Sequence, residues 1–144
     1  MLLWRQVLNA RNIRLMRITA SDVDAAPIAL IQQVDYAAKI VSYAQGYQLL
    51  RAAATSHHWT LNFGGIALTW RGGCIIRSAF LGEIKKAFDR EAAPVNLLRD
   101  RFFRDAVSSR QAAWRRVVMA AVGAGIATPC RSSALAYWDG YRSA

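Results

Sequence analysis

Acidic residues are scarce in this sequence. Nine Asp and Glu stand against 19 Lys and Arg, which gives 144 residues a formal net charge of +10. Such an excess attracts nucleic acid and anionic surfaces without specificity, and it says nothing about fold. Cysteine is scarce as well, because only Cys74 and Cys130 are present. An isolated pair without metal-ligand spacing makes neither a disulfide framework nor a zinc site, which favours a reducing, cytoplasmic compartment.

Long hydrophobic runs and nucleotide-binding fingerprints are missing too. The longest apolar run, 117–127, is about half of the roughly 20 residues that a membrane span needs, so we expect no membrane segment. The glycine pairs 64–65 and 72–73 fit neither GxGxxG nor P-loop spacing, and we expect both pairs to serve helix packing. His57 and His58 are adjacent, so their side chains diverge and predict structural or surface roles rather than a metal site.

The first 20 residues form a basic stretch of their own. It contains Arg5, Arg11, Arg14 and Arg17 and no acidic residue. Three interpretations remain open: a mitochondrial transit peptide, an ordinary basic helix, or an extension foreign to the rest of the domain.

The remainder shows helical periodicity without the alternation typical of strands, so we predict an all-α helical bundle. One apolar face runs through Tyr36, Ile40, Tyr43, Tyr47 and Leu50, and Gly46 within it predicts close packing against another backbone. Asn62 is the expected N-cap of the second helix, and Gly125 followed by Ile126 predicts a helix C-terminus. The predicted helices span 27–56, 62–70, 74–88, a long helix within 95–124, and 129–142.

Few residues suggest chemistry. Asp100 and Asp105 are five apart, so they do not share a helical face as a carboxylate pair. Cys74 lies near Arg71 and Arg77, which could lower its pKa, but its neighbours Ile75 and Ile76 favour a buried, inert thiol.

Arginines flank aromatic residues in two places, a pattern that can hold phosphates and stack bases. The aromatics fall on the predicted apolar face, so we expect them to point inward and the arginines to form a solvated face or a subunit interface. The groups are Trp114 with Arg110, Arg115 and Arg116, and Phe102 and Phe103 with Arg99, Arg101 and Arg104.

Several motifs resemble the C-terminal helical domain of the 6-phosphogluconate dehydrogenase family. The longest read KIVSYAQG, WRGGCIIRS and SALAYWDGYR, with LNFGGIA, NLL and FF in the same order between them. They occupy 39–46, 70–78, 133–142, 61–67, 96–98 and 102–103. Ala127 departs from the pattern, because the family usually has a proline there.

The resemblance implies an NADP-dependent oxidative decarboxylase that converts 6-phosphogluconate to ribulose 5-phosphate in the pentose phosphate pathway, a route of gluconate utilization, and that works as a homodimer. The family's nucleotide-binding domain, catalytic Lys and Glu, substrate motif and C-terminal Arg and His have no counterpart in this sequence. We therefore predict no catalytic, cofactor-binding, substrate-binding or metal-binding residue here.

The expected role is that of a partial dehydrogenase. Residues 1–24 would be a basic extension unlike the family, and residues 25–144 a truncated helical domain that supplies scaffold and dimer interface. NADP belongs to the full-length family, and we expect none to bind this chain alone. The expected partner is a second copy or a full-length dehydrogenase subunit, with nucleic acid bound only non-specifically. The alternative is a basic helical module for nucleic-acid binding or subunit interaction.

Overall fold

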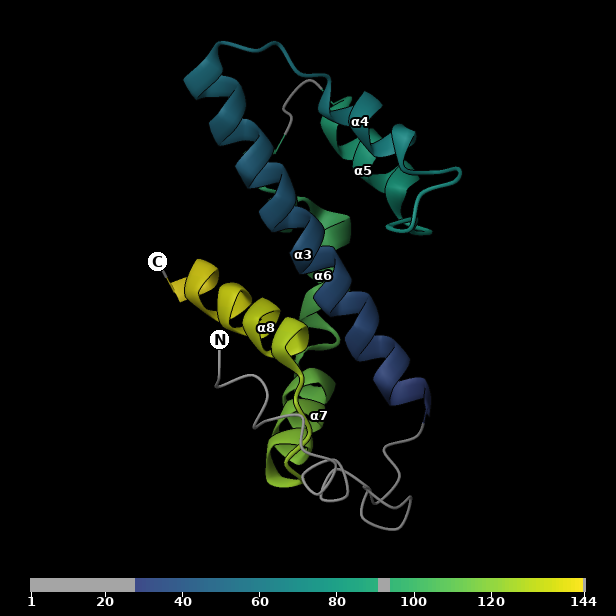
Figure 1. Cartoon of the computed structure of the whole chain (residues 1–144), viewed down its shortest axis with the longest axis vertical. Helices are drawn as coiled ribbons and strands as arrows, with labels where there is room; N and C mark the ends of the chain where they lie inside the picture. Colours follow the sequence, from purple (N-terminus) through teal and green to yellow (C-terminus); the bar gives the residue numbers. More distant parts are fainter. Residues whose placement is uncertain (1–27, 91–93, 144) are drawn as a thin grey trace, which may run out of the picture. The chain divides into compact units, whose positions relative to one another are not determined.

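The structure, a computed structural model, describes residues 28–90 and 94–143, and these are helical with no strand among them (Figure 1). The predicted all-α class is confirmed. The basic stretch at the N-terminus lies outside the described residues. The elements are α3 (Ile28–His57), α4 (Phe63–Thr69), α5 (Leu81–Phe88), the 3₁₀ helix η1 (Leu97–Arg99), α6 (Arg101–Ser108), α7 (Gln111–Gly123) and α8 (Pro129–Ser143).

The described residues fall into two compact units that interleave along the chain. Unit 2 spans Lys39–Ser109, and unit 1 takes the residues up to Ala38 together with those from Arg110 onward. Helix α3 therefore contributes its first residues to unit 1 and the rest to unit 2.

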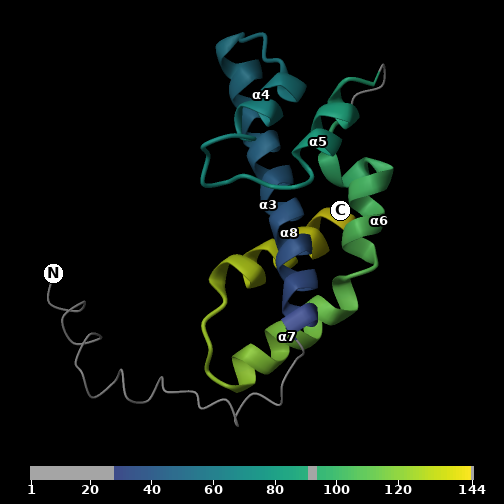
Figure 2. The same ribbon diagram turned by 90° about the vertical axis from the view of Figure 1, so that its right-hand side faces the viewer.

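Unit 2 is built on aromatic side chains. Helices α4 and α5 lie side by side (Figure 2). Their approach is close at Gly64, where an added Cβ would lie 2.8 Å from the Asp89 carboxylate. This confirms the packing role of that glycine. The rings of Tyr47 and Phe88 have centroids 4.9 Å apart, and Phe80 meets Phe103 edge-on at 6.0 Å. Large aromatic side chains bury much apolar area at little cost in rotamer entropy, which makes them an efficient core for a small unit.

Unit 1 combines buried tryptophans with ion pairs between helices. Trp114 of α7 is fully buried and Trp138 of α8 is 5% exposed. Asp139 of α8 accepts hydrogen bonds from both terminal nitrogens of Arg115 on α7. Arg131 of α8 donates to Asp35 of α3, with 2.6 Å between Nε and Oδ1. These contacts tie three helices together within the unit.

The helix ends follow the sequence signals. Asn62 caps α4, because its side-chain oxygen accepts the Gly65 N–H at 2.8 Å. After α7, Gly125 adopts a φ of +69°, and the N–H groups of Gly125 and Ile126 bond to the carbonyls of Val122 and Ala121. This is the Schellman arrangement, in which a left-handed glycine lets two terminal carbonyls find donors. The predicted C-terminus at Gly125 and the final helix from Pro129 are both confirmed.

The helix predicted over 74–88 is wrong in its first half, because α5 begins only at Leu81. The carbonyls of Ile76 and Arg77 accept hydrogen bonds from the Tyr43 hydroxyl and the Lys39 ammonium group of α3. A carbonyl held by another element gains little from an intrahelical amide, so the segment stays a loop.

The single long helix predicted within 95–124 is also wrong, because α6 and α7 are separate. Ser109 ends α6: its N–H bonds to the Asp105 carbonyl and its hydroxyl to the Ala106 carbonyl. Serine hydroxyls that bond to nearby backbone compete with helix continuation. The Arg110 guanidinium lies 5.0 Å from the centre of the Tyr36 ring in unit 1.

Two glycine predictions need correction. A Cβ built on Gly46 meets no atom within 4 Å, so this residue does not mark close backbone packing. Gly72 and Gly73 likewise have open space around them, and Gly73 instead supplies a left-handed φ of +67° to the loop after α4. That conformation favours glycine, which has no Cβ to clash.

Candidate functional site

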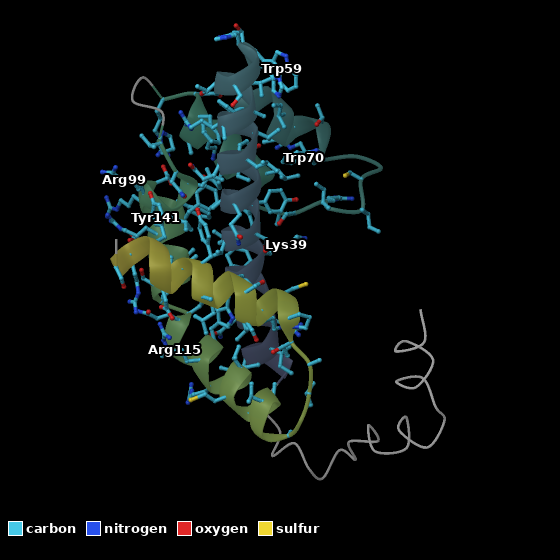
Figure 3. All side chains as sticks on the ribbon, turned by 60° about the vertical axis from the view of Figure 1, so that its left-hand side comes forward. Lys39, Trp59, Trp70, Arg99, Arg115 and Tyr141 are labelled. Carbon is cyan, nitrogen blue, oxygen red and sulfur yellow. The ribbon has the colours of Figure 1, made fainter. Side chains whose placement is uncertain are left out.

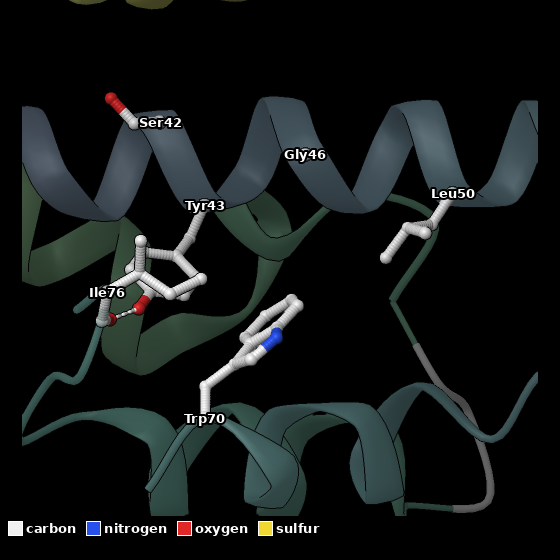
Figure 4. A pocket seen from close by; sticks show the side chains of 6 residues that line it. All are labelled: Ser42, Tyr43, Gly46, Leu50, Trp70 and Ile76. Atoms are coloured by element: carbon white, nitrogen blue, oxygen red, sulfur yellow. Dashed lines mark hydrogen bonds between the residues drawn. The ribbon is translucent and has the colours of Figure 1, made fainter. Parts of the chain in front are cut away.

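The described residues of unit 2 line an apolar groove beside α3 and a second, charged hollow. We call the apolar one the aromatic groove; its volume is about 350 Å³. Tyr43 and Leu50 point from α3 toward Trp70 at the end of α4, and the Ser42 hydroxyl points away (Figure 4). The Tyr43 and Trp70 ring centroids are 5.7 Å apart. The lining residues are Ser42, Tyr43, Gly46, Leu50, Trp70 and Ile76.

The tyrosines beside this groove serve as hydrogen-bond donors. Tyr43 donates to the Ile76 carbonyl, and Tyr47 donates to the Phe63 carbonyl at 3.2 Å. Burial raises the pKa of both phenols above the ordinary value, and electrostatic interactions with Cys74 for Tyr43 and with Tyr43 for Tyr47 raise it further. Both hydroxyls therefore stay protonated at neutral pH and hold α3 to the segments around it.

The loop at the rim of the groove exposes apolar side chains. Ile75 is fully exposed and Ile76 is 43% exposed. Cys74 is half-buried, so the expectation of a buried thiol is wrong. Lys39 and Tyr43 hold this segment as a loop through its backbone carbonyls. Cys74 and its isoleucine neighbours therefore do not lie on the apolar face of a helix, where they would be buried.

The second hollow, of about 420 Å³, is lined by charged side chains, and we call it the arginine hollow. Arg90, Arg99 and Arg101 line it, together with the buried carboxylate of Asp100. Asp100 accepts the Phe102 N–H at 3.0 Å and an Arg90 N–H, so it caps α6 and anchors one guanidinium. Ala87, Pro94 and Val95 complete the lining.

The aromatic residues flanked by arginines divide between core and surface. Phe103 and Trp114 are fully buried, as predicted. Phe102 is 40% exposed, which corrects the expectation that it points inward. Its backbone N–H is fixed on Asp100, and its ring meets Phe103 edge-on at 5.0 Å. Two neighbouring residues in the first turn of α6 thus place one ring inside and one outside.

The charged groups of unit 1 form ion pairs. Hydrogen bonds from Arg115, followed by the charges of Arg115 and Arg142, hold the pKa of Asp139 below its ordinary value. The same pairing raises the pKa of Arg115, and bonding to Asp35 raises that of Arg131. Figure 3 shows Arg115 on α7, below α8 in that view. These partners give the two arginines a structural role.

Within residues 28–90 and 94–143, no three His, Cys, Asp or Glu side chains gather in a way that could hold a metal ion. In the same part of the chain, no helix has the length and hydropathy of a membrane span. His57 and His58 are both exposed, and His57 stacks on Trp59 with 4.7 Å between ring centroids. The prediction that the chain holds no catalytic or ligand-binding residue stays a prediction.

Comparison with known proteins supports the resemblance found in the sequence. Residues 5–144 match the family described as 6-phosphogluconate dehydrogenase, C-terminal domain. The boundary predicted between residues 24 and 25 stays a prediction.

The relatives include "6-phosphogluconate dehydrogenase, decarboxylating" from Ovis aries, 60% identical over 114 residues that make up 79% of this chain and 24% of the relative. The Homo sapiens protein of the same description is 61% identical over 112 residues, 78% of this chain and 23% of the relative. This chain thus spans about a quarter of the length of these relatives.

A solved structure shows a similar fold. It is the 6-phosphogluconate dehydrogenase of Plasmodium falciparum, described in its apo form and in complex with its cofactor NADP+ and its substrate 6-phosphogluconate. The match has a TM-score of 0.74 and 35% sequence identity, and it covers 78% of this chain and 24% of that one.

Proposed function

This chain belongs to the 6-phosphogluconate dehydrogenase family, and from that premise we propose that it acts as helical scaffold and subunit interface within such an enzyme. The family carries out NADP-dependent oxidative decarboxylation of 6-phosphogluconate in the pentose phosphate pathway. We propose that NADP binding and turnover belong to parts of the enzyme other than this chain, and that the chain works in the cytoplasm.

The proposal rests on one observation: the polar and aromatic side chains of the family-like segments bond to and pack against other parts of this chain. In 39–46 and 70–78, the polar side chains Lys39 and Tyr43 bond to the backbone of the loop before α5. Trp70 packs against Tyr43 and Tyr47, at centroid distances of 5.7 and 5.8 Å. In 133–142, Asp139 pairs with Arg115. Groups engaged in this way stabilise helix packing, and a proton donor and acceptor aimed at a common substrate position would need a different arrangement.

Exposed apolar side chains support the interface role. Ile75 is fully exposed beside the aromatic groove, and Leu49 on α3 is 72% exposed. An apolar groove with exposed apolar neighbours is typical of a surface that another protein covers. We propose that a second copy of this chain or a full-length dehydrogenase subunit covers it.

The catalytic half of the proposal is tested by turnover. The purified chain, with helicity checked by circular dichroism, is mixed with NADP and 6-phosphogluconate, and NADPH absorbance is followed. We expect no rate above the buffer control from the folded chain. A rate that grows with chain concentration would overturn this part of the proposal.

The interface half is tested with two charge-introducing variants. Ile75→Asp places a carboxylate next to the aromatic groove, whereas Val122→Asp, at a residue 68% exposed on α7, serves as the control in unit 1. Sedimentation is measured for each chain alone and after mixing with a full-length dehydrogenase subunit. We expect Ile75→Asp to abolish association and Val122→Asp to retain it. Equal association by both variants would contradict an interface at the groove.

A further inference from the structure

Among the described residues that line the arginine hollow, three are arginines and one is a carboxylate. Both carboxylate oxygens of Asp100 are occupied, by the Phe102 N–H and by Arg90. The side chain of Asp100 is 4% exposed, whereas that of Arg90 is 53% exposed, so the remaining edge of this guanidinium faces solvent. The buried carboxylate therefore anchors the arginine without covering it.

Among residues 28–90 and 94–143, Arg101 of the hollow has one distant carboxylate partner and Arg99 has none within ion-pair distance. Arg101 lies 3.7 Å from Asp105, and its side chain is 89% exposed. Arg99, at the end of η1 and labelled in Figure 3, is exposed. In the part of the hollow that the structure describes, three guanidinium groups thus share one carboxylate, and that carboxylate is already bonded to Arg90 and to the Phe102 N–H.

We propose that the arginine hollow binds the phosphate group of a small soluble molecule. Guanidinium groups present paired N–H donors that match phosphate oxygens, and such charge-assisted bonds are stronger than neutral ones. The volume of about 420 Å³ falls in the range of small-molecule sites, about 300–1,000 Å³. Pro94 and Val95, the latter 59% exposed, supply apolar lining for the carbon part of such a ligand.

The arrangement favours a small ligand over a nucleic-acid strand. The three arginines line a single hollow of about 420 Å³, whereas a continuous phosphate backbone would require a groove with charges along its length. The proposal is independent of the scaffold role, because the aromatic groove and the arginine hollow share no lining residue.

The test compares two variants that change the net charge equally. Arg99→Gln removes a guanidinium from the hollow. Arg104→Gln removes one from the exposed face of α6, where Arg104 pairs with Asp105 at 3.2 Å. Binding of inorganic pyrophosphate to the full chain is measured by calorimetry at fixed ionic strength. We expect saturable binding, a loss of about tenfold in affinity for Arg99→Gln, and no loss for Arg104→Gln.

Three results would overturn the proposal. One is the absence of saturable binding to the unmodified chain. Another is equal weakening by both variants, which would show diffuse attraction to a chain of net charge +10. The third is binding of a single-stranded oligonucleotide or of anionic vesicles more tightly than pyrophosphate with the same loss on Arg99→Gln, which would assign the arginines to a polymer or membrane surface.

Discussion

At the residue scale, glycine lowers the stability of a helix at one position of this chain and provides a required backbone conformation at another. Gly46 lies inside α3 with open space where a Cβ would be. Its only effect on stability is therefore the entropic cost of ordering a glycine backbone in a helix. Gly125 also has open space, but its φ of +69° is unfavourable for residues with a Cβ.

We therefore expect opposite effects from two alanine substitutions. Gly46→Ala should raise the free energy of unfolding by about 1 kcal/mol, because alanine is a better helix former. Gly125→Ala should lower it by about 1 kcal/mol, because alanine is strained in the left-handed region. Urea denaturation followed by circular dichroism measures both values. A loss of stability in Gly46→Ala would mean that the open space beside α3 is occupied in solution.

A single carboxylate should give unit 1 part of its acid sensitivity. Bonding to Arg115 lowers the pKa of Asp139 in the folded chain, so its contribution is present above the unfolded value of about 3.9 and is lost as pH falls through the lower folded value. Asp139 is one-third exposed, so the effect is at most about 1 kcal/mol.

The check is the midpoint of thermal unfolding as a function of pH. Asp139→Asn should be less stable than the unmodified chain at pH 7, and the two should converge as the solution becomes more acidic than about pH 4. Asp105→Asn, at an exposed carboxylate of α6, controls for the loss of one negative charge. A difference between Asp139→Asn and the unmodified chain that persists unchanged in acid would contradict this account.

At the element scale, two helix caps differ in the number of interactions that each one makes. Asn62 caps α4 from an exposed position with one hydrogen bond. Asp100 caps α6, is buried, and also holds Arg90. Asn62→Ala should cost about 1 kcal/mol of stability, the usual value of a lost cap. Asp100→Ala should cost about 2 kcal/mol or more, because it also leaves a guanidinium without its partner.

Denaturation of the two cap variants distinguishes these contributions. Asp100→Asn is the informative control, because asparagine can still cap the helix but carries no charge for Arg90. It should fall between the unmodified chain and Asp100→Ala. Equal stability of Asn62→Ala and Asp100→Ala would show that the Arg90 contact adds nothing.

Sequence patterns predicted the elements that local signals define. Asn62, Gly125 and Pro129 mark helix ends through their own backbone chemistry, and the structure has those ends where expected. The loop before α5 could not be predicted, because its carbonyls are held by Lys39 and Tyr43, 38 and 33 residues away in sequence. A helical pattern in one segment carries no information about such distant donors.

The two hollows were missed for a similar reason. The arginine hollow brings Arg90 together with Arg99 and Arg101. Arg90 is held there by a bond to the buried carboxylate of Asp100, ten residues away in sequence, and the sequence pattern does not reveal that bond. Phe102 and Phe103 have the same residue type and nearly the same neighbours, yet one is exposed and the other buried. The family motifs identified the fold correctly. They do not show which side chains of a segment remain exposed once the other elements have packed against it.

At the scale of the whole molecule, α3 links the two units because residues on both sides of position 38 belong to one helix. Ala38→Pro would remove a helical hydrogen bond and introduce a steric clash in that helix, at a cost of about 3 kcal/mol or more. Hydrogen exchange resolved by residue should then show faster exchange in both α4 of unit 2 and α7 of unit 1. Ala38→Gly, which keeps the N–H, should cost only about 1 kcal/mol. Loss of protection confined to one unit would show that α3 does not couple them.

The interleaving of the units also sets an order of events during synthesis of the chain. Asp35 leaves the ribosome 96 residues before Arg131, the partner that holds it in unit 1. At about 5–20 residues per second, the gap lasts roughly 5–20 s, which is long compared with the microseconds in which a helix forms. Unit 2 is complete by Ser109, so it can fold before α7 and α8, the unit 1 partners of the first turns of α3, have been synthesised. During that interval the apolar side chains of those turns, such as Val34, are available to chaperones or to a neighbouring nascent chain.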